Sequence, residues 1–426
     1  MSDPTTGPTA SDTLVIEVAA HLAERLTQLS AALRDQLSGR IEELKGDAPM
    51  LGLLYASVQG NIENILSSLE HGIALEDIEP PSAAYEYARR LAQHGVPVAA
   101  LVRAYRLGQQ GLLEFVFQAC EDLEGDQSVR ADAYGQVVSR TFDYIDWISQ
   151  GVIVVYEAER ESWLAERSRA RADRVEDLVA GRRLDVDDAE SVIGYRLRAL
   201  HLAAVLWIRG TGDQQDPLAG FTRAASVVAA ELGCSRPPLV IPQDRVTAWV
   251  WFPVPDGVQV DVDAIRGALA ASEDASTPMI ALGRTQSGVE GFRSSHLQAV
   301  RTREVATVRD DPAHPVTSFD EPGLRAMTLL VRDPERTAAW VHETLGELAV
   351  DGESQGRLRH TLRQFFEHDS NYTATAEAML MHKNSVKYRL ATAEKTLGRP
   401  IASDRQAVEL AVTICHWLGP AVLRHG

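Results

Sequence analysis

Hydrophobic residues recur at helical spacing through the first part of the chain, from Leu14 to about Trp163. The spacing of three and four residues, typical of the buried face of a helix, is shown by Leu22, Leu26, Leu29, Leu33 and Leu37. Residues that end helices interrupt the pattern at 46–49, 77–81 and 124–126. We therefore predict an all-α bundle of four or five helices over residues 10–165.

A charged helical segment follows the predicted bundle. Residues 157–178 are rich in Ala, Arg and Glu of mixed sign, a pattern that favours an exposed helix. We predict a connecting helix over residues 166–181. The apolar positions of this segment are too sparse to decide between a dimer seam and a solvated helix; they are Leu164, Val175 and Leu178.

The pattern changes after Gly181. Short apolar runs bounded by Gly, Pro or Asp predict strands, and they lie at 199–208, 239–241, 246–252 and 279–282. Helical patterns separate these runs, at 221–232, 262–271 and 294–308. Strands that alternate with helices predict a mixed α/β domain, which we place at residues 182–321.

Beyond Pro322 the strand pattern ends and helical patterns return. Helices are predicted at about 322–331, 334–348, 354–368, 373–380, 383–397 and 404–418. The predicted fold class is therefore multidomain α and α/β. It comprises an N-terminal all-α helical bundle, a central α/β domain and a C-terminal all-α domain at 322–426.

Two of the C-terminal helices form the most informative motif. Residues 371–390 predict a short helix, a tight turn at Met381-His382 and a second helix. Two helices that cross steeply need a small residue at their closest approach and an apolar residue opposite it. Ala376 and Val386, ten positions apart, meet that need. The spacing predicts a helix-turn-helix.

The charge distribution allows a nucleic-acid contact at this motif. The whole chain has a formal net charge of −18, which excludes a polybasic coat protein and a membrane-surface protein. Residues 357–400 contain eight Lys or Arg and four Asp or Glu, a net charge of +4 that leaves −22 on the remainder. A basic segment on an acidic chain attracts phosphate locally and discourages binding elsewhere.

The outward face of the second helix supplies the candidate DNA contacts, since its inward face comprises Val386, Leu390, Ala393 and Leu397. Lys side chains donate to guanine and Asn side chains pair with adenine, whereas Tyr388 and Arg389 are expected at phosphates. The predicted DNA-binding residues are Thr373, Thr375, His382, Lys383, Asn384, Ser385, Lys387, Tyr388 and Arg389. The alternative for such a helix is a solvated face that binds nothing.

The motif resembles the C-terminal helix-turn-helix of the PucR/CdaR class of bacterial transcription regulators. The matching positions are Asn371, Thr375, Ala376, Met379-Leu380, residues 382–386, Tyr388-Arg389-Leu390, Glu394 and Leu397-Gly398. Lys383 stands where the class has Arg, and Ser385 where it has Thr. The loss of a planar guanidinium group at residue 383 puts the base preference in doubt.

The central segment resembles the degenerate GGDEF-like domain that many of these regulators carry. The resemblance rests on residues 178–182, 193–195 and 283–295. The expected hairpin region after Phe252 reads Pro-Val-Pro-Asp-Gly-Val and lacks the acidic signature of a nucleotide cyclase, so we expect no cyclase activity. Glycines 283, 288 and 291 are interpreted as turn residues rather than as a phosphate cradle.

Residues 87–108 resemble the all-α sensory domain at the N-terminus of RsbR-type stress regulators. Gly95 is expected to end one helix and Pro97 to begin the next. RsbR-type domains are globin-like, so the resemblance raises haem binding as an alternative for His71 and His94. Isolated histidines at such positions are more often helix-terminal cations, and we interpret both residues in this way.

The sequence contains no convincing enzyme signature. Walker A, G-x-S-x-G and H-E-x-x-H motifs are absent, as is a clear G-x-G-x-x-G after a strand. Cys120, Cys234 and Cys415 lie far apart and are interpreted as buried small hydrophobic residues in a reducing cytoplasm. We expect no catalysis, no cofactor and no metal.

These patterns together predict a cytoplasmic, sequence-specific transcriptional regulator. Residues 1–4 have no leader pattern, and no apolar run approaches the roughly 18–20 residues of a membrane span. One helix-turn-helix reads few base pairs, so we expect a homodimer or a higher even oligomer on double-stranded DNA. The upstream domains are expected to sense a small-molecule effector or a partner. The alternative is a signalling protein that binds a nucleotide or protein partners without sequence-specific DNA binding.

Overall fold

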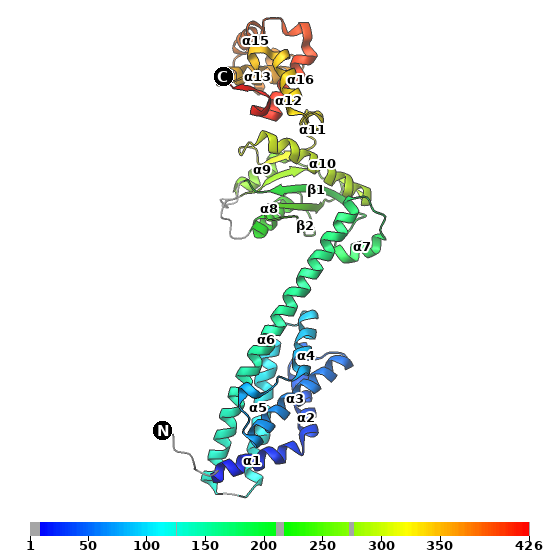
Figure 1. The fold of residues 1–426 in the computed structure, drawn as a ribbon. Coiled ribbons are helices and arrows are strands. Elements are labelled where there is room, and N and C mark those ends of the chain that lie inside the picture. Colours follow the sequence, from blue (N-terminus) through cyan, green and yellow to red (C-terminus); the bar gives the residue numbers. More distant parts are fainter. Residues whose placement is uncertain (1–8, 125, 210–216, 272–276, 426) are drawn as a thin grey trace, which may run out of the picture. The chain divides into compact units, whose positions relative to one another are not determined.

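The computed structural model describes residues 9–124, 126–209, 217–271 and 277–425 (Figure 1). Residues 1–4, in which no leader was expected, lie outside the described part. The chain divides into two compact units, one up to Arg169 and the other from Ala170. The finer borders expected at 165/166, 181/182 and 321/322 stay predictions.

A helical bundle forms the first unit, as predicted. Its helices are α1 (Ala10–Ala23), α2 (Leu26–Arg40), α3 (Ala48–His71), α4 (Ser82–Gln93), α5 (Val98–Asp122) and α6 (Gln127–Val179), with the short 3-10 helices η1 (Glu42–Leu44) and η2 (Leu75–Asp77). All three predicted breaks lie where a helix begins. The break between α1 and α2, at Glu24 and Arg25, was missed because no Gly or Pro marks it, and the bundle therefore has one helix more than the upper prediction.

Local sequence explains several ends of these helices. Asp47 caps α3, since its side chain accepts a hydrogen bond from the Met50 N–H at 3.0 Å. Gly95 adopts a left-handed φ of 70° between α4 and α5, and Pro97 is the N-cap of α5. His71 lies in the last turn of α3 and His94 caps the C-terminus of α4, so both are helix-terminal as predicted.

Helix α6 contributes residues to both units. Its final turns supply Val175 and Leu178 to a core of the second unit, and residues 161–170 are all exposed. The connecting helix predicted at 166–181 is therefore not a separate element but the end of a helix that begins at Gln127. Neither Gly nor Pro occurs between residues 152 and 180, so the backbone has no reason to break there.

A mixed sheet lies at the centre of the second unit. Its strands are β1 (Leu200–Trp207), β2 (Leu239–Pro242), β3 (Thr247–Pro253), β4 (Met279–Leu282), β5 (Gln286–Ser287) and β6 (Val316–Ser318). The order is β2-β3-β1-β4-β6, with β5 also on β1, and every pairing is antiparallel except β4 with β6. The four predicted strands are confirmed, whereas β5 and β6 are too short to show a period.

Helices cover both faces of this sheet. They are α7 (Val186–Ile193), α8 (Pro217–Glu231), α9 (Val262–Ala271) and α10 (Gly288–Arg309). Leu202, Ala204 and Leu206 of β1 pack with α8 and α9, whereas Ala203 shares a core with Phe292 of α10. Successive strand residues face opposite sides, so the near-continuous apolar run of β1 follows from burial on both faces.

Helix α10 lies very close to the sheet. A Cβ atom on Gly283 would lie 2.1 Å from the Ser295 carbonyl oxygen, and one on Gly291 would lie 2.7 Å from the Gln286 carbonyl carbon. Gly288 instead adopts a left-handed φ of 75°. The interpretation as turn residues therefore holds for Gly288, while Gly283 and Gly291 permit close packing.

The hairpin of the sheet lies at residues 243–246, between β2 and β3. The segment after Phe252, where it was expected, leads instead towards α9. The actual hairpin reads Gln-Asp-Arg-Val and contains no glycine. The hairpin therefore lies earlier in the chain than expected, and it also lacks the acidic Gly-Gly signature of a nucleotide cyclase.

The six predicted C-terminal helices are all present. They are α11 (Leu324–Leu330), α12 (Pro334–Leu345), α13 (Glu353–Glu367), α14 (Tyr372–Ala378), α15 (Lys383–Leu397) and α16 (Arg405–Leu418), with 3-10 helices η3 (Gly346–Ala349), η4 (Ile401–Asp404) and η5 (Gly419–Val422). Strands β7 (Val350–Asp351) and β8 (Arg424–His425) pair in parallel and were missed. Val305 of α10 belongs to the core that these helices form.

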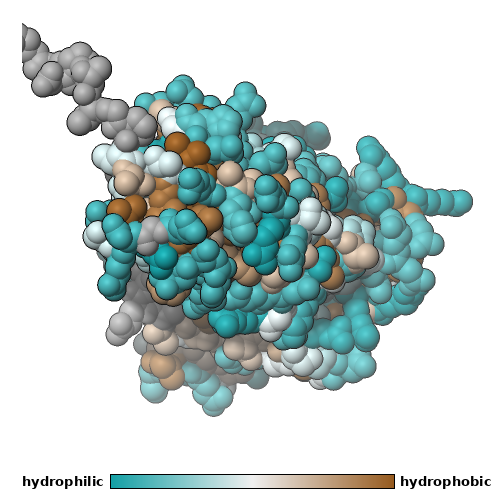
Figure 2. Space-filling model, turned by 90° about the horizontal axis from the view of Figure 1, so that it is seen from below, coloured by the Kyte–Doolittle hydropathy of each residue, from teal (hydrophilic) through white to brown (hydrophobic). Residues whose placement is uncertain are grey.

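Hydrophilic side chains cover most of the face drawn in Figure 2, and hydrophobic ones gather in small areas. Cys120 and Cys415 are buried as predicted, whereas Cys234 is only partly buried. Within the described residues, no helix has the length and apolarity to cross a bilayer. The same residues contain no cluster of three or more His, Cys, Asp or Glu suited to a metal ion.

His296 of α10 makes the stability of the second unit depend on pH. Its ring is 1 % exposed and lies 4.3 Å from the Trp249 ring, and burial lowers its pKa to about 4. Between about pH 6.5, the ordinary pKa of histidine, and about pH 4, His296 is mostly protonated in the unfolded chain but neutral in the folded chain. The contribution of His296 to the unfolding free energy is therefore fully present above pH 6.5 and is lost as the pH falls towards 4.

We expect His296→Phe to remove part of this pH dependence. Between pH 7 and pH 5 the wild type should lose about 2 kcal/mol of unfolding free energy through this group, and the variant should lose that much less. Urea unfolding followed by tryptophan fluorescence at both pH values measures the difference. Equal losses in the two proteins would contradict the assignment.

Candidate nucleic-acid interface

Helices α14 and α15 form a helix-turn-helix whose turn is set by backbone hydrogen bonds. The Met381 N–H donates to the Ala376 carbonyl at 2.9 Å, and Leu380 adopts a left-handed φ of 49°. His382 is the N-cap of α15, and its Nδ1 accepts from the Asn384 N–H at 3.2 Å. The tight turn therefore lies at residues 379–381, slightly before the predicted Met381-His382.

The two residues predicted at the crossing of the helices are both buried in the core of the C-terminal helices. Ala376 is 6 % exposed, and Val386 is fully buried. Leu390 and Ala393 follow Val386 on the buried face of α15, as expected for residues four and seven positions further along a helix. This packing fixes α15 against α14 and leaves the opposite face of α15 on the surface.

Eight of the nine predicted DNA-binding residues have accessible side chains. Arg389 is partly buried, and the exposed ones are Thr373, His382, Lys383, Asn384, Ser385, Lys387 and Tyr388. Thr375 is the exception: it is fully buried, and its hydroxyl donates to the Asn371 carbonyl at 2.7 Å. Thr375 therefore supports the fold of α14, and its prediction as a DNA contact is wrong for this conformation.

Contacts between the two helices position two of the lysines. The Lys383 Nζ donates to the Thr373 Oγ1 at 3.0 Å. The Lys387 Nζ lies 5.8 Å from the centre of the Tyr372 ring, within the range of a cation–π interaction. Both cations thus lie where α15 meets the start of α14.

Two surface residues of this motif were missed from the sequence. Tyr372 is 37 % exposed beside Lys387, and Leu380 at the turn is 95 % exposed. The sequence offered no local signal for Leu380, because an exposed leucine with a left-handed backbone contradicts ordinary patterning.

Four of the eight basic residues counted in 357–400 serve the fold. Arg359 is buried and donates to the carbonyls of Leu348 and Val350 at 2.6 and 2.8 Å. The remaining three pair with carboxylates: Arg357 with Glu353, Arg363 with Glu367, and Arg399 with Asp404. The other four, Lys383, Lys387, Arg389 and Lys395, all lie on α15. The candidate surface is therefore narrower than the charge count suggested.

Comparison with known protein families gives three matches along the chain. Residues 15–171 match the N-terminal domain of the RsbT co-antagonist protein rsbRD, and residues 177–305 match the GGDEF-like domain. Residues 358–414 match the PucR C-terminal helix-turn-helix domain. The three expected resemblances are thereby confirmed.

Similar proteins match over short stretches. An uncharacterized protein in the pkwA 5' region of Thermomonospora curvata is 35 % identical over 83 residues, 20 % of this chain and 45 % of that protein. The transcriptional activator PmfR of Paenarthrobacter nicotinovorans is 35 % identical over 78 residues, 18 % of this chain and 17 % of PmfR. The chain thus spans less than half the length of these curated relatives.

A solved structure, the regulator of polyketide synthase expression from Bifidobacterium adolescentis, is 18 % identical to this chain. The match covers 59 % of this chain and 98 % of that one, with a TM-score of 0.28.

The N-cap of α14 should contribute measurably to the stability of the motif. The Asn371 side chain accepts from the N–H groups of Thr373 and Ala374 at 2.9 and 3.3 Å. We expect Asn371→Ala to lower the unfolding free energy by about 1 kcal/mol. Asn371→Asp, which keeps the acceptor and adds favourable charge at the helix start, should retain stability in urea unfolding. A similar loss in both variants would show that the cap is not the cause.

Proposed function

We propose that this chain, which combines an RsbRD-type N-terminal domain, a GGDEF-like domain and a PucR-type C-terminal helix-turn-helix, is a sequence-specific DNA-binding transcriptional regulator. The observation that carries the proposal is the helix-turn-helix itself. Its second helix presents four cations on a chain whose net charge is −18. Such a helix attracts phosphate groups locally, while the acidic remainder of the chain disfavours non-specific binding to nucleic acid.

In this proposal the start of α15 enters the major groove. Lys383, Asn384 and Lys387 approach base edges, because the N-terminal residues of a recognition helix reach furthest into the groove. His382 and Ser385 flank them. Thr373, Tyr388 and Arg389 approach phosphates, which position the helix without reading sequence. The Lys383–Thr373 hydrogen bond supports this arrangement, since it holds one cation at the start of α15.

The protein acts as a homodimer or a higher even oligomer in this proposal. A single helix-turn-helix reads too few base pairs for useful specificity, so two copies must be held about one DNA turn or a multiple of it apart. Exposed large hydrophobic residues of the first unit and of α6 support contacts between copies: they are Phe117, Phe142, Trp163 and Leu164. Monomers in light scattering, both free and on DNA, would contradict the geometry.

The upstream domains then control how the helix-turn-helix pair is presented. An effector or partner that binds one arrangement of these domains better shifts the population towards it. The role requires no catalysis, and a bacterial regulator that binds chromosomal DNA works in the cytoplasm. PmfR, the relative named a transcriptional activator, supports the regulatory reading.

Selection of bound fragments from randomised and genomic DNA, with the full-length chain at physiological salt, tests the proposal. We expect a motif with two half-sites, which a Lys383/Lys387/Arg389 triple-alanine variant fails to enrich. Weak, salt-insensitive DNA binding together with tight nucleotide binding would instead favour a signalling protein without sequence-specific DNA binding.

Replacing Lys387 and Arg389 by Ala should weaken binding to the selected site by about tenfold or more. The unfolding free energy should change by less than about 1 kcal/mol, since Lys387 is exposed and its contact with Tyr372 is weak. Fluorescence anisotropy and thermal unfolding measure the two effects. Lys395→Ala, near the other end of α15, is the matched control and should weaken binding less. A large loss of melting temperature in the double variant would make the two side chains structural.

A further inference from the structure

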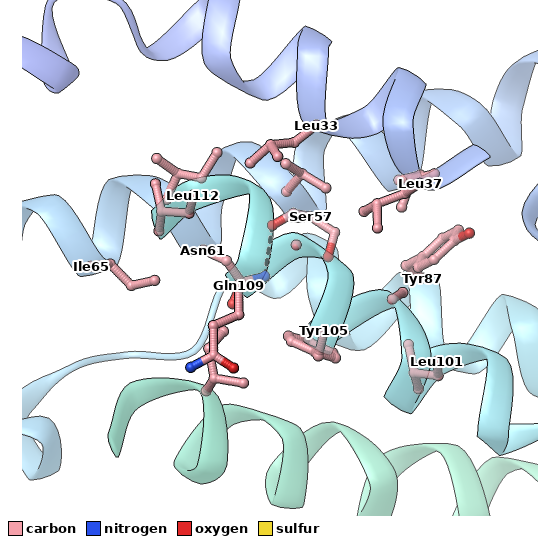
Figure 3. Close-up of a pocket in the computed structure, with 16 residues that line it drawn as sticks. Leu33, Leu37, Ser57, Asn61, Ile65, Tyr87, Leu101, Tyr105, Gln109 and Leu112 are labelled. Atoms are coloured by element: carbon pink, nitrogen blue, oxygen red, sulfur yellow. Dashed lines mark hydrogen bonds between the residues drawn. The ribbon is translucent and has the colours of Figure 1, made fainter. Parts of the chain in front are cut away.

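A cavity of about 60 Å³ lies in the first unit and is lined by residues of α2, α3, α4, α5 and α6 (Figure 3). Its wall is mostly aliphatic, and includes Leu33, Leu37, Ile65, Leu101 and Leu112. None of the described lining residues is Asp, Glu, Lys, Arg or His. A bare ion buried there would lose its hydration without a partner of opposite charge, so the wall suits an uncharged occupant.

One polar group in this wall lacks a partner. Gln109 of α5 is 9 % exposed, and its Nε2 is buried without a hydrogen-bond partner in the part of the chain that the structure describes. Leaving a buried donor unpaired costs about 1–3 kcal/mol. Asn61, in the same wall, shows the contrast: its Nδ2 donates to the Ser57 carbonyl at 2.7 Å, and its Oδ1 accepts from the Tyr144 hydroxyl at 3.0 Å.

The glycine next to Gln109 leaves space in the wall. A Cβ atom on Gly108 would meet no atom within 4 Å, although Gly108 lies among the lining residues. Three residues further along α5, a Cβ atom on Gly111 would lie 2.4 Å from the Leu33 Cδ2. Gly111 therefore permits close packing of α2 on α5, whereas Gly108 keeps part of the cavity open.

We propose that this cavity binds a small, uncharged, mostly apolar molecule that carries one hydrogen-bond acceptor, and that Gln109 Nε2 donates to this acceptor. A cavity needs about 10–15 Å³ of space to hold one water molecule, so about 60 Å³ holds a molecule of about four heavy atoms, such as a short-chain ketone or aldehyde. Water is a poorer occupant, because a buried water needs about two to four polar partners. Gln109 Nε2 is the one lining atom among the buried, unpartnered side-chain atoms of the described structure.

The role of this site as an effector site rests on the proposed function, whereas its occupancy does not. Binding is therefore measured directly on the full-length chain with labelled Ile, Leu and Val methyl groups. Two probes are titrated: acetone, which carries an acceptor, and xenon, which does not. We expect both to shift methyl resonances of Leu33, Ile65 and Leu112 saturably. Acetone that shifts none of these resonances would overturn the proposal.

Gln109→Met keeps the length of the side chain and removes the donor. We expect it to weaken the binding of acetone about 3- to 10-fold, which is the contribution of one net hydrogen bond. The affinity for xenon should stay unchanged. Gln110→Met is the matched control, because Gln110 is exposed and donates to Glu114 at 3.0 Å. Equal acetone affinity in wild type and Gln109→Met would overturn the assignment of the donor.

Gly108→Val should fill the cavity and abolish binding of both probes, while Gly135→Val, on an open surface of α6, should leave binding intact. If Gly108→Val does not fold, Gly108→Ala takes its place and should cause a smaller loss of probe binding. Unchanged binding in Gly108→Ala would overturn the location. DNA affinity is measured separately with and without acetone: a change supports the effector role, and no change with bound acetone overturns that role while the site stands.

Discussion

Helix α10 is shared by two cores, and the second unit depends on this sharing. Phe292 and His296 pack against the tryptophans of β3, and Gly283 allows the helix to approach the sheet. At its other end Val305 belongs to the core of the C-terminal helices, and the Arg309 guanidinium lies 5.5 Å from the Trp417 ring of α16. Because close-packed helices transmit displacement rather than absorb it, a shift of α10 on the sheet moves the helices that carry the helix-turn-helix. Helix α10 thus contributes both to a core of the sheet and to the core that carries the candidate nucleic-acid interface.

Helix α6 has a comparable role between the units. Ile145 lines the cavity of the bundle, and Val175 and Leu178 of the same helix enter a core of the second unit. The exposed stretch at 161–170 has few tertiary contacts to hold it, so its structure relies on unbroken backbone hydrogen bonding and on helix-forming residues.

The basic residues divide by chemistry. Arginine offers several donors in a rigid planar group, and Arg359 uses them on two carbonyls near η3 while others pair with carboxylates. Lysine is a flexible point charge, and the three lysines of this region all lie on α15. The net charge of a segment consequently overstates the charge available to DNA. Within residues 357–400, the positive charge that is not used in ion pairs or on carbonyls is confined to α15, and the rest of the chain is acidic.

The sequence by itself determined the order of domains, the four longer strands, the C-terminal helices and the burial of Ala376 and Val386. Each of these follows from a local period or spacing, which is written in adjacent residues. It also marked nearly all of the exposed face of α15. Only the tertiary structure decided that Thr375 is buried, that Gly283 admits α10, and that Gln109 lacks a partner. These facts depend on which distant residues meet, and a single sequence carries no measure of that distance.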